Sequence, residues 1–438
     1  MMPQVTVIGA GLAGCEAAWQ LAKRGVTVRL TEMKPHKKSP AHERDDFAEL
    51  VCSNSLRSDR LENAVGLLKA EMRLLDSLII RVADENRVDA GGALAVDRAG
   101  FSETVTRYIH AHPLITIEQG EAAQIPREGL VIIATGPLTA DTLAADIAAR
   151  VSGAAGDFLY FYDAAAPIVD ANSIDMSRAF FASRYDKGTP DYLNCGMTEA
   201  EYLSFWQALC AAKETKIHGF EDSRVFEGCM PIEVMARRGT DTLRYGPLKP
   251  VGLNHPQSGT RYHAVVQLRR DNAAGTMYNL VGFQTHLLHG EQKRVFSMIP
   301  GLEQAEFLRY GVMHRNTYLN APRLLNRYFC LKSEPRILFA GQITGVEGYV
   351  ESAASGLLAG LELTRELQGK PPLDFPAETA IGALALYISN ESVANFQPMN
   401  VNFGIIPPLG ERIKGKTNKN AAISERALRC VQGLLKAL

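Results

Sequence analysis

Two cysteines in this sequence stand where a thiol would be converted to its reactive thiolate form. Cys52 precedes a run of Ser and Asn residues that can cap a helix, and Arg57 follows closely. Cys229 comes two residues before Pro231, which suits the first position of a helix that Gly239 would end. Because a helix N-terminus and a nearby cation both lower a thiol pKa, either cysteine could serve as a nucleophile.

A basic cluster follows the second cysteine. It consists of Arg237, Arg238, Arg244 and Lys249, with Tyr245 between them. Cations that neutralise phosphates and rings that stack on bases are the two components of binding to unpaired RNA. The pattern therefore indicates a local basic patch that could bind phosphates, in a chain without net positive charge. The same residues also fit a half-buried cysteine beside a solvated arginine face.

The first thirty-two residues supply the element that would position this chemistry. An apolar strand over residues 4–8 runs into G-x-G-x-x-G, then a helix and a second strand over residues 26–30 that ends near Glu32. Gly9 would make the tight turn, Gly11 would let a pyrophosphate approach the backbone, and Gly14 would let helix and strand pack. Glu32 is placed to bind a ribose hydroxyl. The motif residues expected at the cofactor are Gly9, Ala10, Gly11, Leu12, Ala13 and Gly14.

Two later stretches resemble second and third approaches to the same cofactor. A buried strand over residues 130–134 ends in A-T-G, and another over residues 336–340 opens onto G-Q and a glycine-rich helix start. A late strand followed by a small-residue helix is typical of FAD proteins rather than NAD proteins, although the first stretch alone also fits an ordinary strand-to-turn step. The cofactor residues expected here are Thr135, Gly136, Gly341, Gln342, Gly345 and Gly348, with Tyr349 as a weaker catalytic candidate.

The separation of these stretches predicts the domain organisation. We expect an α/β protein with a Rossmann-like FAD-binding domain of the two-dinucleotide-binding type, formed by residues 1–180 and 325–438. Residues 181–324 lack a βαβ rhythm and are expected to form an inserted α+β domain. Helices are predicted near residues 61–78, 103–111, 200–212 and 376–389, and strands near residues 114–118, 261–270 and 277–283.

Composition narrows the class of protein. The chain has 438 residues and a net charge of −1, so a strongly basic nucleic-acid binder is not indicated globally. No apolar run approaches the roughly 18 residues of a membrane span, and the chain starts directly with a core strand rather than a signal peptide. Seven cysteines without C-x-x-C spacing argue for reduced thiols in a cytoplasmic protein and against a zinc site.

Taken together, the motifs resemble those of the folate- and flavin-dependent tRNA uracil-5 methyltransferases. The two cysteine segments and the D-T-L-R-Y-G-P run are specific, whereas related flavoproteins of tRNA wobble-uridine modification share the dinucleotide motif. The matching stretches are residues 9–14 with Glu32, 50–55, 134–139, 227–233, 241–253, 341–349 and 399–404.

The resemblance implies formation of 5-methyluridine at the T-loop uridine of tRNA. The carbon would come from 5,10-methylenetetrahydrofolate, and the electrons from FAD reduced by NADH or NADPH. Cys229, beside the arginines, is expected to be the nucleophile on uracil C6, and Cys52 to act at the flavin or the methylene carbon. Candidate walls for the folate are residues 284–286, including His286, and residues 396–403. No obligate protein partner is indicated.

Three alternatives remain open at this stage. A NAD(P)H–flavin oxidoreductase could use Cys52 and Cys229 as a redox pair, although the absence of C-x-x-C weighs against it. A flavin-stabilised RNA-binding protein without activity is the second alternative. An enzyme with the same chemistry on ribosomal RNA is the third, since the choice of RNA depends on surface contacts.

Overall fold

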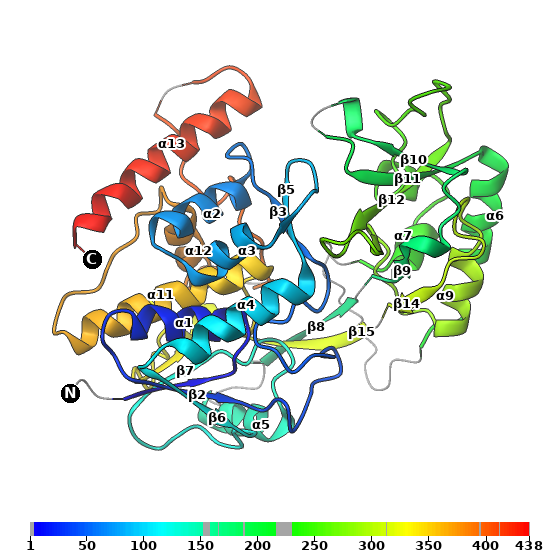
Figure 1. The fold of residues 1–438 in the computed structure, drawn as a ribbon. Helices are drawn as coiled ribbons and strands as arrows, with labels where there is room; N and C mark the ends of the chain where they lie inside the picture. The colour runs from blue at the N-terminus through cyan, green and yellow to red at the C-terminus, as the bar shows by residue number, and fades with distance from the viewer. Residues whose placement is uncertain are drawn as a thin grey trace.

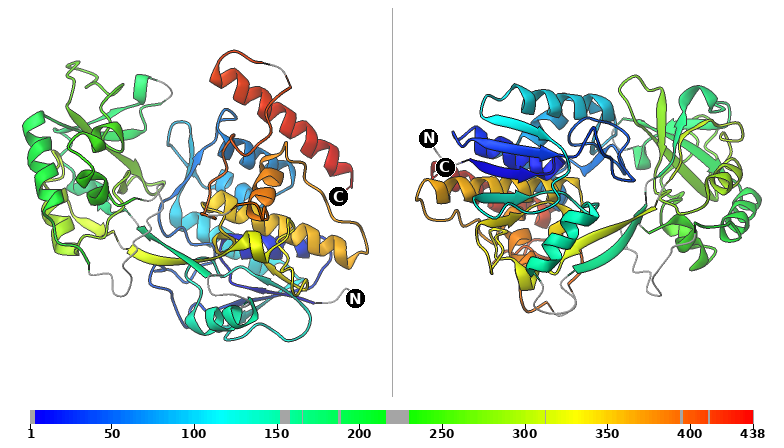
Figure 2. Two further views of the ribbon diagram at one scale, coloured as in Figure 1. Left: turned by 180° about the vertical axis from the view of Figure 1, so that it is seen from behind. Right: turned by 90° about the horizontal axis from the view of Figure 1, so that it is seen from below.

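The chain folds into two lobes, each built on its own sheet. The computed structural model describes residues 4–151, 158–164, 166–186, 189–215, 230–311, 313–393, 396–410 and 412–437. In Figures 1 and 2 the two lobes lie side by side, and the strands β8 (Phe158–Ala164) and β15 (Met313–Leu319) run between them. These two strands pair antiparallel over their whole length. Two passes of the chain therefore connect the lobes.

The first lobe is organised around a five-stranded sheet. All neighbouring strands in it are parallel, and the core strands are almost entirely apolar, as expected for a sheet covered on both faces. Because the strands are parallel, their carboxyl ends meet at one edge. In spatial order the strands are β16 (Ile337–Phe339), β7 (Leu130–Ile133), β1 (Val5–Ile8), β2 (Val28–Glu32) and β6 (Ile115–Gln119).

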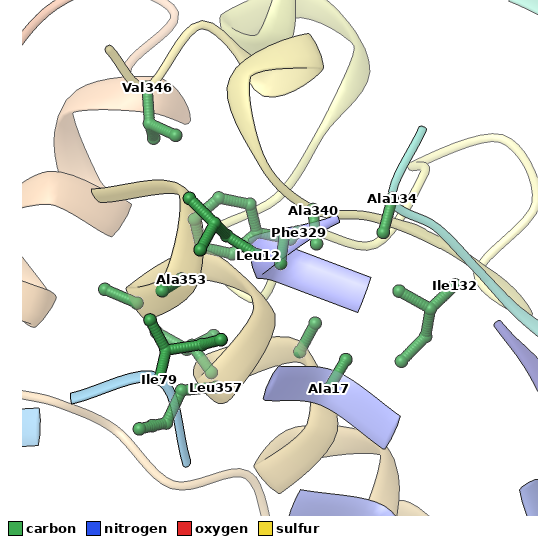
Figure 3. Packing of buried hydrophobic residues seen from close by; sticks show 14 of the residues in the cluster. Leu12, Ala17, Ile79, Ile132, Ala134, Phe329, Ala340, Val346, Ala353 and Leu357 are labelled. Carbon is green, nitrogen blue, oxygen red and sulfur yellow. The ribbon is translucent and has the colours of Figure 1, made fainter. Parts of the chain in front are cut away.

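Two helices at the centre of this lobe pack unusually close. In α11 (Tyr349–Leu367), a Cβ on Gly356 would lie 2.1 Å from the Ala13 carbonyl oxygen of α1 (Leu12–Ala22), so only glycine permits the contact. Figure 3 shows this core, with Ala17 from α1 and Leu357 from α11. The other helices of the lobe are α2 (Ala64–Leu74), α3 (Leu78–Glu85), α4 (Arg98–Ala111), α5 (Asp141–Val151), α10 (Ala321–Leu324), α12 (Ala380–Ile388) and α13 (Lys416–Leu434).

The second lobe contains a six-stranded antiparallel sheet with its own hydrophobic core. Its strand β9 precedes residue 181, so this sheet begins earlier in the chain than the expected inserted segment. The strands, in spatial order, are β10 (Ala179–Ala182), β11 (Tyr192–Met197), β12 (Ala264–Arg270), β13 (Met277–Leu280), β9 (Ile168–Asp170) and β14 (Phe307–Arg309). The helices are α6 (Glu199–Cys210), α7 (Ile232–Arg237), α8 (Thr242–Tyr245) and α9 (His289–Phe296).

Most predicted elements are present, but the region after Cys52 differs from the prediction. Residues 55–58 form strand β3, which joins β5 (Ala93–Val96) and β4 (Arg87–Val88) in a small sheet. The capping residues before it therefore start no helix, and that part of the argument for a Cys52 thiolate is wrong. The helix predicted over residues 61–78 is α2, which is shorter than predicted and ends at Leu74. Asp76 is left-handed (φ 57°), and Ser77 caps the next helix, α3.

Of the helices in the described ranges, none is both long and apolar enough to cross a membrane.

Candidate functional site

A long cleft lies at the carboxyl edge of the parallel sheet, where a Rossmann-like fold binds its ligand. About 1110 Å³ of empty space, part of it open to solvent, lies between its walls. The walls come from the loops after β1, β2, β7 and β16, which sequence reasoning placed at one cofactor. The predicted residues that line it are Gly9, Ala10, Gly11, Leu12, Ala13, Glu32, Thr135, Gly136, Gly341, Gln342 and Tyr349.

The glycines of the first motif divide into two groups. A Cβ on Gly9 would lie 2.7 Å from the Ala134 carbonyl oxygen, and one on Gly14 only 1.8 Å from the Gly9 oxygen, so both permit close packing. A Cβ on Gly11 would meet no atom of the described residues within 4 Å. Since Gly11 lines the cleft and N-caps α1, the first amide groups of this helix can serve a pyrophosphate.

Glu32 ends β2 with its carboxylate beside the glycine loop. The side chain is buried and accepts hydrogen bonds from the amides of Ala10 (2.7 Å) and Lys34 (3.0 Å). These bonds hold the carboxylate in the wall of the cleft, where it could bind ribose hydroxyls. The open glycine cradle, the helix N-terminus and this acid together fit the adenosine diphosphate part of FAD.

Two predicted cofactor residues lie outside the wall of the cleft and shape the backbone behind it. Gly345 (φ +83°) and Gly348 (φ +110°) shape the turn that leads into α11. A Cβ on Gly345 would lie 2.5 Å from the Phe396 ring. Their conformations explain the need for glycine and place the start of α11 against the cleft.

Tyr349 connects the cleft to Cys52. Tyr349 lines the cleft, and its hydroxyl accepts hydrogen bonds from the amides of Cys52 (2.7 Å) and Ser53 (3.1 Å). Burial raises the pKa of Tyr349, and the neighbouring Cys52 thiol acts in the same direction. The hydroxyl therefore stays protonated at neutral pH and positions the backbone of Cys52.

The cation expected beside Cys52 is engaged elsewhere. Arg57, in a left-handed conformation (φ 61°), forms an ion pair with the fully buried Glu351. Arg98 interacts with Cys52 instead. Burial opposes its charge, but Asp271, Tyr349 and Cys52 outweigh that effect and raise the pKa of Arg98.

Sequence reasoning missed Arg98 and its partner Asp271. They are 173 residues apart in the chain, and each is unremarkable in its local sequence. Asp97 is the N-cap of α4 and accepts a hydrogen bond from the Gly100 amide (2.8 Å). This capping pattern is the one sequence signal close to Arg98, and it indicates a helix start rather than a functional residue.

Cys229 lies outside the described residues. The helix predicted after it is present as α7, with Pro231 at the N-cap and Gly239 (φ +150°) just beyond the C-cap Arg238. Glu233 in this helix is fully buried and accepts hydrogen bonds from the Thr285 hydroxyl and the His286 backbone amide.

The basic cluster lies on the second lobe around α7 and α8. Arg237 pairs with Glu214, and Arg244 pairs with Asp241 at 2.5 Å, so both have carboxylate partners. Arg237 and Arg238 are exposed, Arg244 and Lys249 are half-exposed, and the side chain of Tyr245 is 83% exposed.

Two rings of the candidate folate walls, His286 and Phe396, are buried. His286 is 6% exposed, with Nε2 at 2.5 Å from Glu214 and 3.3 Å from Glu233. Phe396 is buried and packs against Tyr318 and other core rings. These contacts favour structural roles for both side chains in this conformation.

Comparisons with known proteins agree with this geometry. The family model described as "Glucose inhibited division protein A" matches residues 4–371. The methylenetetrahydrofolate–tRNA-(uracil-5-)-methyltransferase TrmFO of Desulfitobacterium hafniense is 59% identical over 427 residues, covering 98% of this chain and 97% of the relative. The protein of the same name from Desulforamulus reducens is 61% identical over 425 residues, covering 97% and 96%.

A solved structure shares the fold. GidA of Aquifex aeolicus in its form II crystal has a TM-score of 0.69 and 15% sequence identity, and the match covers 99% of this chain and 76% of that one. The full-length identity with the curated relatives is far higher. The chain therefore belongs to the TrmFO family of methylenetetrahydrofolate–tRNA-(uracil-5-)-methyltransferases.

Proposed function

We propose that this protein methylates C5 of the T-loop uridine of tRNA. The carbon comes from 5,10-methylenetetrahydrofolate, and the electrons pass from NADH or NADPH through FAD. The observation that carries the proposal is the place of Tyr349, which lines the cleft that fits FAD while its hydroxyl holds Cys52. The names of the full-length relatives state the same reaction class.

The chemistry explains why a thiol and a flavin belong in one protein. Uracil C5 is a weak nucleophile, and addition of a thiolate to C6 makes it an enolate-like carbon. C5 then attacks the folate methylene, the bond from that carbon to the folate nitrogen breaks, and the C5 proton leaves. FAD held by the glycine loops and Glu32 would, when reduced, supply the hydride that converts the methylene to methyl as the thiol departs from C6.

Each part of the chain has a proposed task. The first lobe, which takes in most of residues 1–180 and 325–438, holds FAD through the glycine loops and Glu32. Residues 181–324 face the tRNA, with phosphate contacts from Arg237, Arg238, Arg244 and Lys249. Cys229 is the nucleophile on uracil C6, and Cys52 acts at the flavin or the methylene carbon. Because tRNA, folates and reduced nicotinamides meet in the cytoplasm, we expect the reaction there.

The direct test is incubation with unmodified tRNA, methylenetetrahydrofolate and NADH, followed by nucleoside analysis. We expect 5-methyluridine only when all three are present. A parallel reaction with ribosomal RNA distinguishes the two RNA targets. Oxidation of NADH at the same rate without RNA or folate, and no methylated nucleoside, would point to a plain flavin oxidoreductase.

The roles of the two thiols can be separated with tRNA that carries 5-fluorouracil at the target. Loss of a proton from C5 is then blocked, so the thioether at C6 should persist. We expect Cys52→Ala to trap this RNA and Cys229→Ala not to. Trapping by Cys229→Ala alone would reverse the assignment, and Cys430→Ala serves as a control for loss of an unrelated thiol.

A further inference from the structure

The loop of residues 50–55, here called the Cys52 loop, is held from both lobes. From the first lobe, the Tyr349 hydroxyl accepts hydrogen bonds from the amides of Cys52 and Ser53. Arg98 donates a hydrogen bond to the Leu50 carbonyl oxygen. From the second lobe, Arg269 donates to the Ser53 hydroxyl (2.7 Å) and to the Asn54 side-chain oxygen (2.9 Å). The loop is therefore part of the joint between the lobes.

Asn54 is a link between the two sides. Its side chain is fully buried, and its amide nitrogen donates to the carbonyl oxygens of Val96 (2.9 Å) and Arg270 (2.8 Å). Val96 ends β5 in the first lobe, whereas Arg270 ends β12 in the second. A side chain of this loop thus spans the boundary.

A buried ion pair lies beside the loop. Arg98 at the start of α4 meets Asp271 just after β12, through Nε to Oδ2 (3.0 Å) and Nη2 to Oδ1 (2.8 Å). Both residues are buried, with Asp271 only 1% exposed. The next turn is fixed by Asp97, which accepts from the Ala273 amide (2.8 Å). Paired, bidentate contacts of this kind determine orientation as well as distance.

At this joint, directional hydrogen bonds and an ion pair connect the lobes, and apolar packing contributes less. The hydrophobic cores of the two lobes form separate clusters. Apolar side chains of similar volume could replace a buried ion pair with little loss of stability, so stability alone does not explain the pair. Fixed bond directions do determine where the end of β12 stands relative to the Cys52 loop.

We propose that Arg98, Asp271, Arg269 and Asn54 are positioning residues that set Cys52 against the second lobe. This inference rests on the proposed function, because it assigns to the joint the alignment of the Cys52 thiol with RNA bound to that lobe. A displacement of reacting groups by about 1 Å can lower a rate by about a hundredfold. The joint therefore affects the chemical step more than RNA binding.

The test compares Asp271→Asn with Asp271→Glu, which keeps the carboxylate. Asp84→Asn is the matched control, since Asp84 and Arg73 form a similar bidentate pair away from the loop. For Asp271→Asn we expect kcat for tRNA methylation to fall about tenfold or more with KM within about threefold, and Asp271→Glu to restore part of the loss. Flavin content should not change.

A second readout follows the loop without RNA. The rate of Cys52 alkylation by iodoacetamide, measured by mass spectrometry, should rise several-fold in Asp271→Asn, while Cys210 and Cys430 react as in the unmodified protein. If Asp271→Asn does not fold, Arg269→Lys takes its place, because this variant leaves the buried ion pair intact. It should also raise the rate of Cys52 alkylation. A lower melting temperature with unchanged Cys52 alkylation and unchanged kcat would overturn the proposal.

The two readouts separate this inference from the function itself. If the unmodified protein does not methylate RNA but Asp271→Asn still alters Cys52 alkylation, the joint is supported and the proposed function fails. If methylation occurs and neither Asp271→Asn nor Arg269→Lys changes the thiol or kcat, the function stands and the joint has no positioning role.

Discussion

At the scale of single residues, Gly11 and Gly14 stand three positions apart and do different work. Valine at position 11 should project into the cleft without meeting described atoms of the protein, so the fold should form and FAD retention should be lost. Valine at position 14 would collide with the Gly9 carbonyl and should prevent folding. Flavin absorbance and circular dichroism of the two variants check this. A yellow Gly11→Val protein would contradict the placement of FAD.

Tyr349→Phe tests the hydroxyl apart from the ring. Loss of the acceptor leaves the amides of Cys52 and Ser53 without their shared partner, at a cost of about 1–3 kcal/mol. FAD should still bind because position 349 still lines the cleft. We expect a lower melting temperature and slower methylation with full flavin content. Unchanged stability and activity would show that the two hydrogen bonds contribute nothing.

Local spacing accounts for what the sequence could predict at this scale. The glycine loop and Glu32 follow each other within one βαβ unit, so their positions at the cleft could be inferred from the order of residues. The surroundings of Cys52 could not, because Arg98 and Asp271 meet only after both lobes have formed. The ion pair of Arg57 could not be inferred for the same reason, since its partner Glu351 is distant in the chain.

At the scale of elements, β3 owes its position to a buried lysine. Lys69 in α2 is fully buried and donates to the carbonyl oxygens of Leu56 (2.8 Å) and Ser58 (2.7 Å). Helical periodicity predicted α2 correctly in part, but a lysine on a helix is normally assigned to solvent. Lys69 therefore holds β3 through a contact that no sequence pattern reveals.

Lys69 gives a pH-dependent prediction. Burial lowers its pKa to about 7 from the ordinary value of 10.5. The unfolded chain holds the proton at every pH below about 10, whereas the folded protein takes it up only near pH 7. Its contribution to the free energy of unfolding is therefore lost as the pH falls from about 10 to 7, each pKa unit being worth about 1.4 kcal/mol.

Chemical unfolding of Lys69→Met across this pH range measures the effect. The free energy of unfolding of the unmodified protein minus that of the variant should increase from pH 7 towards pH 10. Lys370→Met, at an exposed site, should show a difference that does not vary with pH. A constant difference for Lys69→Met would mean that the amine is charged in both states throughout this range, and that its pKa in the folded protein is not lowered.

At the scale of the whole molecule, the proposed function predicts that tRNA binds the second lobe through cations that solvent can reach. Arg238→Glu and Lys249→Glu should weaken tRNA binding and reduce the slope of log K against log salt by about 1 for each phosphate that the protein no longer neutralises. Lys370→Glu controls for the change in net charge. Filter binding over a salt series is sufficient. Unchanged affinity and slope would place the RNA surface elsewhere.

The order of the strands in the parallel sheet has a consequence for the newly made chain. Its edge strand β16 and the helix α11 that covers α1 come from residues 337–367, after the whole second lobe has been synthesised. At roughly 5–20 residues per second, α1 waits on the order of tens of seconds for its packing partner. Until α11 has been made, the apolar face of α1, including Ala17, stays without that cover, and chaperones are the means by which a cell protects such a surface.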